Sequence, residues 1–251
     1  MKRAASPGPR QVARLILARL RKMSDPVKAA GAQAYFKHTV KCFGVAAPDL
    51  RSLAGELFAS VKDAWSLDDA VELCRLLLPR PELEAKAVAI LVFERFKKDF
   101  HPGLLPMVKG WLEKDFLNNW ASLDLFCAAS LGALIARHPE VADELKRWAF
   151  HSNRWVKRAS AVSFIKPAKN PEFLPVIYEV AASLFPVDDD LIHKAAGWLL
   201  REAGKTDSKR LKTFLLRNGP AVPRTTVRYA VERFPERERR RLLELTRKKR
   251  R

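Results

Sequence analysis

Apolar residues recur every three or four positions along almost the whole chain, and the alternating pattern of a β-strand is almost absent. In the first such segment, from Gln11 to Met23, leucine, isoleucine and valine fall on one side of a helix and arginines on the other. A period near 3.6 residues gives a continuous apolar face only on a helix. The sequence therefore predicts an all-α protein.

Proline followed by an acidic residue marks several of the predicted helix starts. Proline suits the first turn because its missing N–H has no partner there, and an acid interacts favourably with the helix dipole. The pairs are Pro48-Asp49, Pro81-Glu82, Pro139-Glu140, Pro171-Glu172 and Pro235-Glu236. The second predicted helix begins at Pro26, continues through Tyr35 and Phe36, and stops before Gly44.

Short helices joined by shorter turns predict successive helical hairpins of roughly 35 to 40 residues, as in HEAT-type repeats. We expect one α-solenoid domain over residues 1–251, with basic extensions at about 1–10 and 236–251. A compact helical bundle is the alternative architecture. A solenoid has a concave face, and one that is lined by Lys and Arg could hold a nucleic acid duplex.

The charge of the chain favours a polyanionic partner. Lys and Arg number 47 against 28 Asp and Glu, a net charge of +19, so nucleic acid is the first candidate. A membrane is not expected, because the longest clean apolar run, Ala87 to Phe93, is far shorter than the ~20 residues of a spanning helix. The basic N-terminus leads into no apolar signal region, and we expect a cytoplasmic protein.

Residues that would indicate a cofactor are not arranged for one. The sequence contains no Gly-rich phosphate loop, and its histidines have no metal-ligand spacing. Cys42, Cys74 and Cys127 are widely spaced among apolar neighbours, which predicts reduced core residues. We expect no metal, no cofactor and no thiol chemistry.

One acidic residue interrupts an apolar stretch between Asn118 and Pro139. Asp124 has leucine and phenylalanine neighbours, and Trp120 lies four residues earlier, which places the indole and the carboxylate on one helix face. Burying an unpaired carboxylate is expensive, so Asp124 needs a cationic partner, a role near the helix start, or a cleft to face. A structural ion pair and a charge that favours the helix dipole are the alternatives to an active site.

Two later segments combine cations with tryptophan. Arg154, Lys157 and Arg158 share a helical face after the expected cap Asn153, and Trp155 is predicted to point to the core.

Lys194, Trp198 and Arg201 have the same spacing, with Gly197 leaving room beside the indole. Cations interleaved with aromatic rings suit sugars and bases as well as phosphates. A core tryptophan and a solvated arginine face are the alternatives for each.

Taken together, four segments resemble the HEAT-like-repeat DNA glycosylases of the AlkD type, the alkylpurine DNA repair family. The segments cover residues 34–53, 118–140, 153–162 and 195–206, and the resemblance extends over about residues 12–235. Its most specific parts are Trp120-x-x-x-Asp124 and Gly197-Trp198-x-x-Arg201-Glu202. The family has an aromatic residue before the first tryptophan and an acid after it, where this chain has Asn119 and Ala121. This departure bears on lesion preference.

The resemblance implies that Asp124 is the catalytic carboxylate. It also implies that five residues bind DNA or the lesion nucleotide: Trp120, Arg158, Trp198, Tyr35 and Arg201. An alkylated N3 or N7 makes the purine cationic and a good leaving group, so an ionised Asp124 would stabilise the oxocarbenium-like sugar and orient a water. Arg158 would help to keep Asp124 ionised.

The resulting prediction is a monofunctional DNA glycosylase of base excision repair that hydrolyses the N-glycosidic bond of cationic N3- or N7-alkylated purines in duplex DNA. By the resemblance it uses no deep base pocket and no metal, and we expect a monomer that joins the nucleoid when bound to DNA. A non-catalytic HEAT-repeat scaffold for DNA or RNA is the main alternative, and a solenoid for acidic protein partners is a third reading. The C-terminal run of arginines is expected to attach to DNA without sequence preference.

Overall fold

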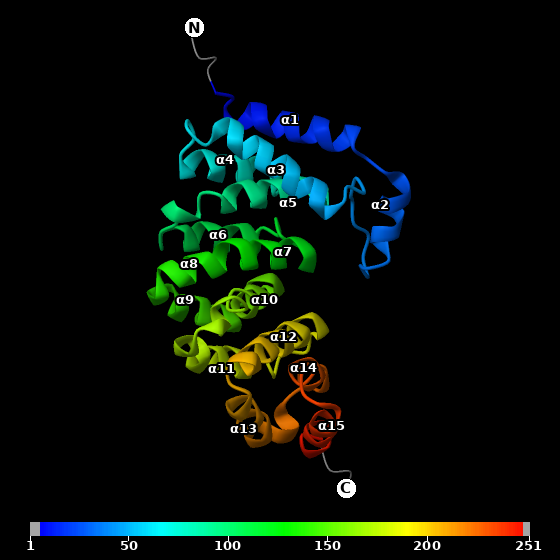
Figure 1. Cartoon of the computed structure of the whole chain (residues 1–251), viewed down its shortest axis with the longest axis vertical. Helices are drawn as coiled ribbons and strands as arrows, with labels where there is room; N and C mark the ends of the chain where they lie inside the picture. The colour runs from blue at the N-terminus through cyan, green and yellow to red at the C-terminus, as the bar shows by residue number, and fades with distance from the viewer. Residues whose placement is uncertain (1–5, 248–251) are drawn as a thin grey trace. The chain divides into compact units, whose positions relative to one another are not determined.

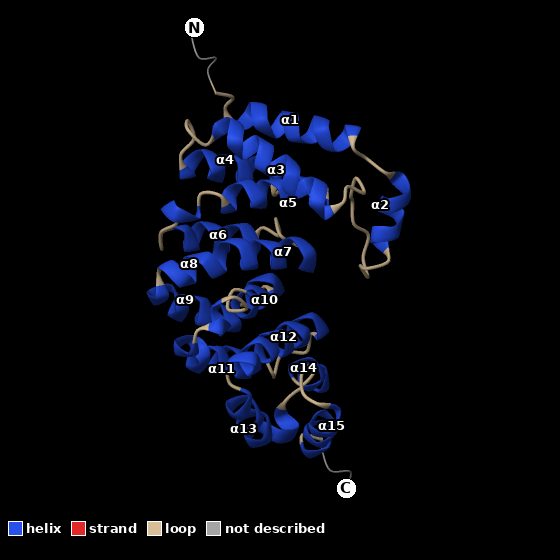
Figure 2. Cartoon of the chain, viewed as in Figure 1, coloured by secondary structure: helices blue, strands red, loops and turns tan. Residues whose placement is uncertain are grey.

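The computed structural model of the chain describes residues 6–247, and these fold mainly into helices, most of which are joined by short turns (Figures 1 and 2). Residues 6–247 contain no β-strand, and their isolated β-bridge joins Lys41 to Glu82. The predicted all-α, helical-repeat fold is confirmed. The HEAT type of the repeats and their basic concave face stay predictions.

The chain divides into two compact units, Met1–Ser130 and Leu131–Arg251. The single domain over residues 1–251 stays a prediction. The helices of the first unit are α1 (Pro9–Lys22), α2 (Pro26–Gln33), α3 (Ala47–Val61), α4 (Leu67–Leu77), α5 (Leu83–Glu94), η1 (Lys97–Asp99), α6 (Leu104–Glu113) and α7 (Trp120–Phe126), which continues into the π-helical turn η2 (Cys127–Leu131).

Helix α5 is the centre of the first unit. It packs against α1, α3, α4 and α7, and its apolar residues are buried around the whole circumference, including Val88, Ala89, Ile90 and Phe93. A helix that is apolar on every side belongs inside a protein, surrounded by other helices. Phe93 stacks on Phe126 with 6.0 Å between ring centroids, which fixes α7 against this core helix.

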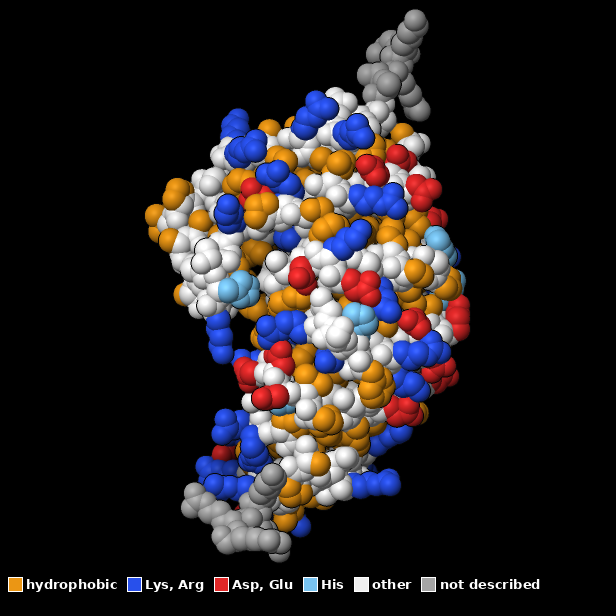
Figure 3. All heavy atoms as spheres, turned by 180° about the vertical axis from the view of Figure 1, so that it is seen from behind, with side chains coloured by type: hydrophobic (Ala, Val, Ile, Leu, Met, Phe, Trp, Pro, Cys, Tyr) orange, Lys and Arg blue, Asp and Glu red, His pale blue; other side chains and the backbone are white. Residues whose placement is uncertain are grey.

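The second unit contains α8 (Gly132–Arg137), η3 (Pro139–Val141), α9 (Ala142–Arg147), η4 (Trp148–Phe150), α10 (Arg154–Val162), η5 (Pro167–Lys169), η6 (Pro171–Phe173), α11 (Leu174–Ser183), α12 (Asp190–Thr206), α13 (Ser208–Asn218), η7 (Gly219–Ala221), α14 (Arg224–Ala230) and α15 (Glu236–Leu245). Its central helix is α12, which packs against α10, α11, α13 and α14. Figure 3 shows Lys and Arg side chains gathered over the C-terminal part of this unit.

Glycine at position 197 allows α12 and α14 to approach closely. A Cβ atom there would lie 2.5 Å from the Cβ of Tyr229 and 2.7 Å from the carbonyl oxygen of Thr226. The space that the missing side chain leaves is therefore filled by α14 and is not left open as the sequence suggested.

The second helix ends earlier than predicted, at Gln33, because the Gln33 side chain organises the next residues as a loop. Its Nε2 donates to the carbonyl oxygens of Phe36 at 3.3 Å and His38 at 2.9 Å, and its Oε1 accepts from the Val40 N–H at 2.9 Å. Tyr35 and Phe36 consequently lie in this loop and not on a helix.

The start predicted at Pro81-Glu82 is also shifted. Helix α5 begins at Leu83, with Glu82 as its extended N-cap. The reason is the pairing of this segment with Lys41, whose carbonyl oxygen accepts the Leu83 N–H at 2.9 Å.

The predicted basic extensions are partly built into the fold. The Trp65 indole donates to the Pro7 carbonyl oxygen at 2.9 Å, and α15 packs on α13 with Leu242 and Thr246 buried. The remainder of these extensions, residues 1–5 and 248–251, lies outside the described residues.

One described helical run, Trp120–Arg137, is long and apolar enough to satisfy a length and composition criterion for a membrane span. Over half of it, 56%, is buried inside the protein, and a core helix meets the same criterion. Packing within the fold therefore accounts for its apolar character.

Candidate functional site

The start of α7 presents the acid that the sequence singled out. Asn119 is a buried N-cap whose side chain accepts the Ser122 N–H at 2.9 Å, the arrangement that satisfies an otherwise unpaired donor of the first turn. Trp120 is the first residue of the helix and Asp124 lies one turn later, and both side chains are half-buried. Indole and carboxylate therefore share one helix face, as their spacing predicted.

Phe36 is a site residue that the sequence analysis did not identify. Its ring stacks on Trp120, with 5.2 Å between centroids and 21° between planes. An offset stack of this kind contributes about 0.5 to 1.5 kcal/mol beyond the area that it buries. The stack fixes the indole one turn before Asp124. The neighbouring Tyr35 is 77% exposed and belongs to the same loop.

A buried carboxylate holds the far end of this loop. The Oε1 atom of Glu84, on α5, accepts three consecutive backbone N–H groups. The donors are Phe43 at 2.9 Å, Gly44 at 2.7 Å and Val45 at 3.2 Å. Hydrogen bonds to a charged acceptor are the stronger kind. Gly44 has φ +80°, a conformation that favours glycine, so the loop can turn its amides toward one oxygen.

A buried lysine two residues later on α5 performs a similar task. The Lys86 ammonium donates to the carbonyl oxygens of Leu78, after α4, and Phe116, in the segment that leads to α7. Burial lowers the pKa of Lys86 to about 8, and the charge of Glu82 opposes this shift. Glu84 and Lys86 thus connect α5 to the two segments that carry Phe36 and Trp120. No local pattern in the sequence marks either residue.

The helix ends at Phe126 in a π-helical turn, Cys127–Leu131, which the sequence did not predict. Turns of this type frequently occur inside helices at functional sites.

Helix α10 separates the cations that the sequence placed on one face. Asn153 caps the helix by accepting the N–H of Trp155 at 2.7 Å, and Trp155 is buried, both as predicted. Arg154 is exposed and forms an ion pair with Asp189 at 2.6 Å, whereas Arg158 is only 5% exposed. The Arg158 guanidinium donates to the Leu191 carbonyl oxygen in the first turn of α12. A buried guanidinium needs a close hydrogen-bond acceptor. Through its hydrogen bond to Leu191, Arg158 links α10 to α12.

Helix α12 carries the other predicted group. Lys194 forms an ion pair with Asp190 at 2.9 Å, and this hydrogen bond raises the Lys194 pKa. Trp198, one turn later, is half-buried.

One further turn along, the Arg201 side chain is 18% exposed and pairs with the carboxylates of Glu202 and Glu232. A DNA contact by Arg201 stays a prediction, and it would compete with these two ion pairs.

The predicted residues are shared between the two units. In the first unit the structure brings together Trp120 and Asp124, with Phe36 on the indole and Tyr35 beside Phe36. In the second unit α10 and α12 carry the remainder, namely Arg158, Trp198 and Arg201.

Within residues 6–247, no group of three or more His, Cys, Asp and Glu side chains is placed to hold a metal ion. Cys42, Cys74 and Cys127 are not joined in disulfides. Cys74 and Cys127 are buried, as expected of core residues, whereas Cys42 is half-buried. Burial raises the pKa of the Cys42 and Cys74 thiols, which disfavours the reactive thiolate.

Comparison with known proteins adds two findings. Residues 16–234 match the model of a family described as DNA alkylation repair enzyme. A solved structure from Enterococcus faecalis, described as a predicted DNA alkylation repair enzyme, superimposes with a TM-score of 0.75 at 18% sequence identity, covering 85% of this chain and 98% of that chain. At this identity the likeness shows a shared fold. The comparison with curated proteins gives no match.

Proposed function

Because the chain belongs to the DNA alkylation repair enzyme family, we propose that it is a DNA glycosylase that hydrolyses the N-glycosidic bond of cationic N3- or N7-alkylated purines in duplex DNA. Family membership gives a role in the repair of alkylated DNA. The bond that is broken and the residues that act on it are our proposal. The observation that supports it most directly is that Asp124 and Trp120 lie on one face of α7, where the Phe36 ring stacks on the Trp120 indole.

The chemistry suits a carboxylate that acts without a general acid. An alkylated N3 or N7 leaves the purine positively charged, so the base departs with the electrons of the C1′–N bond and becomes neutral without prior protonation. Positive charge then develops on the sugar, and an ionised Asp124 stabilises it and accepts a hydrogen bond from the attacking water. One such electrostatic contribution accelerates a reaction by roughly 100- to 1,000-fold. The products are the neutral alkylated base, an abasic site and the proton that the attacking water loses.

The other predicted residues have supporting roles in this proposal. Trp120 and Trp198 offer aromatic faces to the sugar and the cationic nucleotide, an attraction of about 0.5 to 2 kcal/mol each. Tyr35 is exposed enough to contact DNA directly. Arg201 supplies positive charge near phosphates, and Arg158, which is buried, adds only to the positive field around them.

Selectivity then comes mainly from the lability of the cationic nucleotide, and a deep base pocket is not required. We propose that the protein acts on duplex DNA as a monomer in the cytoplasm, associated with the nucleoid when bound, without metal or cofactor.

The test measures release of 7-methylguanine and 3-methyladenine from methylated duplex DNA by the native protein and by Asp124→Asn, with DNA affinity measured at fixed salt. We expect Asp124→Asn to lose base release by roughly 100-fold or more while it retains DNA binding. The matched control is Asp68→Asn, an exposed acid in the first turn of α4, which should release bases at the native rate.

Two results would contradict the proposal. Tight DNA binding by the native protein with no base release would favour the scaffold alternative. Full activity of Asp124→Asn would show that another group stabilises the sugar.

A further inference from the structure

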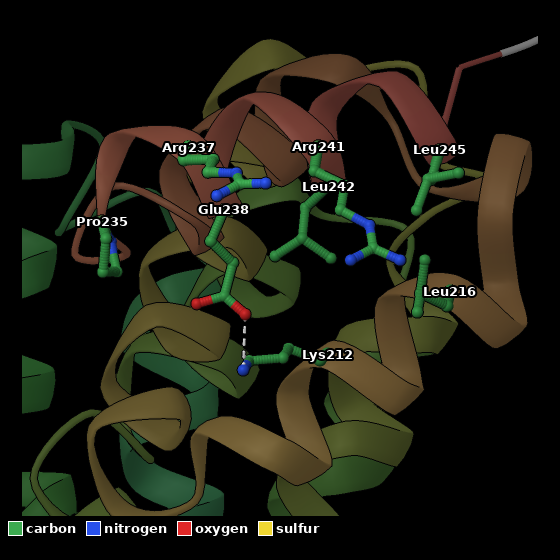
Figure 4. Close-up of a pocket in the computed structure, with 8 residues that line it drawn as sticks. All are labelled: Lys212, Leu216, Pro235, Arg237, Glu238, Arg241, Leu242 and Leu245. Carbon is green, nitrogen blue, oxygen red and sulfur yellow. Dashed lines mark ion pairs between the residues drawn. The ribbon is translucent and has the colours of Figure 1, made fainter.

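A groove of about 580 Å³ lies between α13 and α15 (Figure 4). It is lined by Lys212, Leu216, Pro235, Arg237, Glu238, Arg241, Leu242 and Leu245. Its volume is within the range of ~300 to 1,000 Å³ that is usual for ligand sites. The family match ends at residue 234, so α15, which forms one wall, lies outside the part of the chain that the repair-enzyme family defines.

The groove exposes apolar surface on both walls. Leu216 on α13 is 47% exposed and Leu245 on α15 is 52% exposed, and Figure 4 shows both side chains at the same end of the groove. Leu242 is buried between the two helices. Among the large apolar side chains that are exposed in the described part of this unit, only Phe150 lies elsewhere. Covering the two leucines would stabilise a complex, because removing apolar area from water is favourable.

Positive charge accompanies this apolar surface. Arg237 and Arg241 lie one turn apart on α15, and both are exposed. Neither forms an ion pair with any residue between 6 and 247, whereas their neighbours Arg239 and Arg240 both pair with Glu236. The acid of the groove, Glu238, is neutralised by Lys212 at 2.5 Å.

We propose that this groove docks a short acidic segment of a partner protein, which inserts large apolar side chains between α13 and α15 while its carboxylates pair with Arg237 and Arg241. An amphipathic segment that presents an apolar face to a groove is a common mode of peptide recognition, and the charge complementarity orients it. This docking site is independent of the proposed glycosylase chemistry.

Two other occupants fit less well. Duplex DNA would use the arginines but would leave the leucines uncovered, because protein–DNA contacts are mostly to phosphates and are more polar. A second copy of the chain carries the same net charge of +19 and would be repelled.

The experiment uses the full-length protein and fluorescence anisotropy. The probe is a fluorescein-labelled peptide of roughly three helical turns with Glu and Leu at helical spacing. A second peptide has Ser in place of each Leu, and unlabelled duplex DNA serves as competitor. We expect the first peptide to bind at least about fivefold more tightly than the second, because serine cannot replace the apolar area that each leucine buries.

Variants of the groove and matched variants elsewhere locate the site. Leu216→Ser, Leu245→Ser and Arg241→Ala should each weaken binding of the first peptide by about threefold or more. Leu15→Ser and Arg21→Ala, exposed residues of the same types on α1, should leave binding unchanged. Because all five side chains are exposed, the variants should fold, and circular dichroism checks this.

Three results would overturn the proposal. The first is a sign of general electrostatic attraction. It would be seen as equal binding of the two peptides, or as normal peptide binding by the leucine variants together with weakened binding by Arg241→Ala. The second is displacement of the peptide by DNA together with leucine variants that bind normally. The third is the absence of binding at millimolar peptide.

Discussion

Replacing Gly197 by alanine tests how closely α12 and α14 approach. Two effects oppose each other. Alanine favours the helix by about 0.5 to 1 kcal/mol relative to glycine. Against this, the new methyl group would lie 2.5 Å from the Tyr229 Cβ and 2.7 Å from the Thr226 carbonyl oxygen.

The magnitude follows from those two distances. Carbon atoms in contact are ordinarily ~3.5 to 4.0 Å apart, so the Tyr229 contact is about 1 Å too short. Thr226 is a backbone obstacle and Tyr229 is obstructed at its Cβ, so neither can rotate away, and the helices must separate. Overpacking of this kind costs typically 1 to 3 kcal/mol, and more where backbone must move. We expect a net loss of about 2 kcal/mol in the free energy of unfolding.

The assay is urea denaturation followed by far-ultraviolet circular dichroism. With a slope of about 2 kcal/mol per molar urea, the loss lowers the midpoint of Gly197→Ala by about 1 M. The matched control is Gly110→Ala in α6, where a Cβ would meet no atom within 4 Å. It should gain about 0.5 to 1 kcal/mol. If Gly197→Ala were as stable as Gly110→Ala, the close packing of α12 on α14 would be refuted.

Substitutions of three residues in the first unit give further predictions. Glu84→Gln keeps the shape of the side chain but removes the charge that accepts three loop amides, and should lower the free energy of unfolding by about 1 to 2 kcal/mol in urea denaturation. The pKa of Lys86 is about 8 in the folded protein, below its ordinary value of 10.5, so the unfolded state binds more protons between these pH values. The native protein should therefore gain stability relative to Lys86→Met as the pH rises from 8 to 10.5, and a constant difference would contradict this. Phe36→Leu removes the stack on Trp120 and should slow base release by roughly 2- to 10-fold, with DNA affinity unchanged, if the stack is worth ~0.5 to 1.5 kcal/mol.

Sequence patterns predicted the parts of this fold that depend on local chemistry. The apolar period identified the helices, the Asn153 side chain identified a cap, and the spacing of Trp120 and Asp124 placed them on one face. Each of these follows from residues within one or two turns of one another.

The parts that were not predicted depend on contacts between distant segments. The Phe36 ring meets Trp120 across 84 positions of the chain, and Arg158 is buried because α12 offers it a carbonyl oxygen. Its charge and spacing matched those of a surface cation. No local signal distinguishes a buried arginine from an exposed one until the neighbouring helix is in place.

The three amides on the Glu84 oxygen also make the order of the loop cooperative. Phe43, Gly44 and Val45 share one acceptor, so displacement of the Glu84 side chain weakens all three hydrogen bonds at once, and this acceptor lies in the first turn of α5. Opening of this loop is therefore linked to unfolding of the N-terminal end of α5, so the two behave as one local unfolding unit. The mobility of Tyr35 and Phe36 is thus set partly by the stability of a helix that carries neither of them.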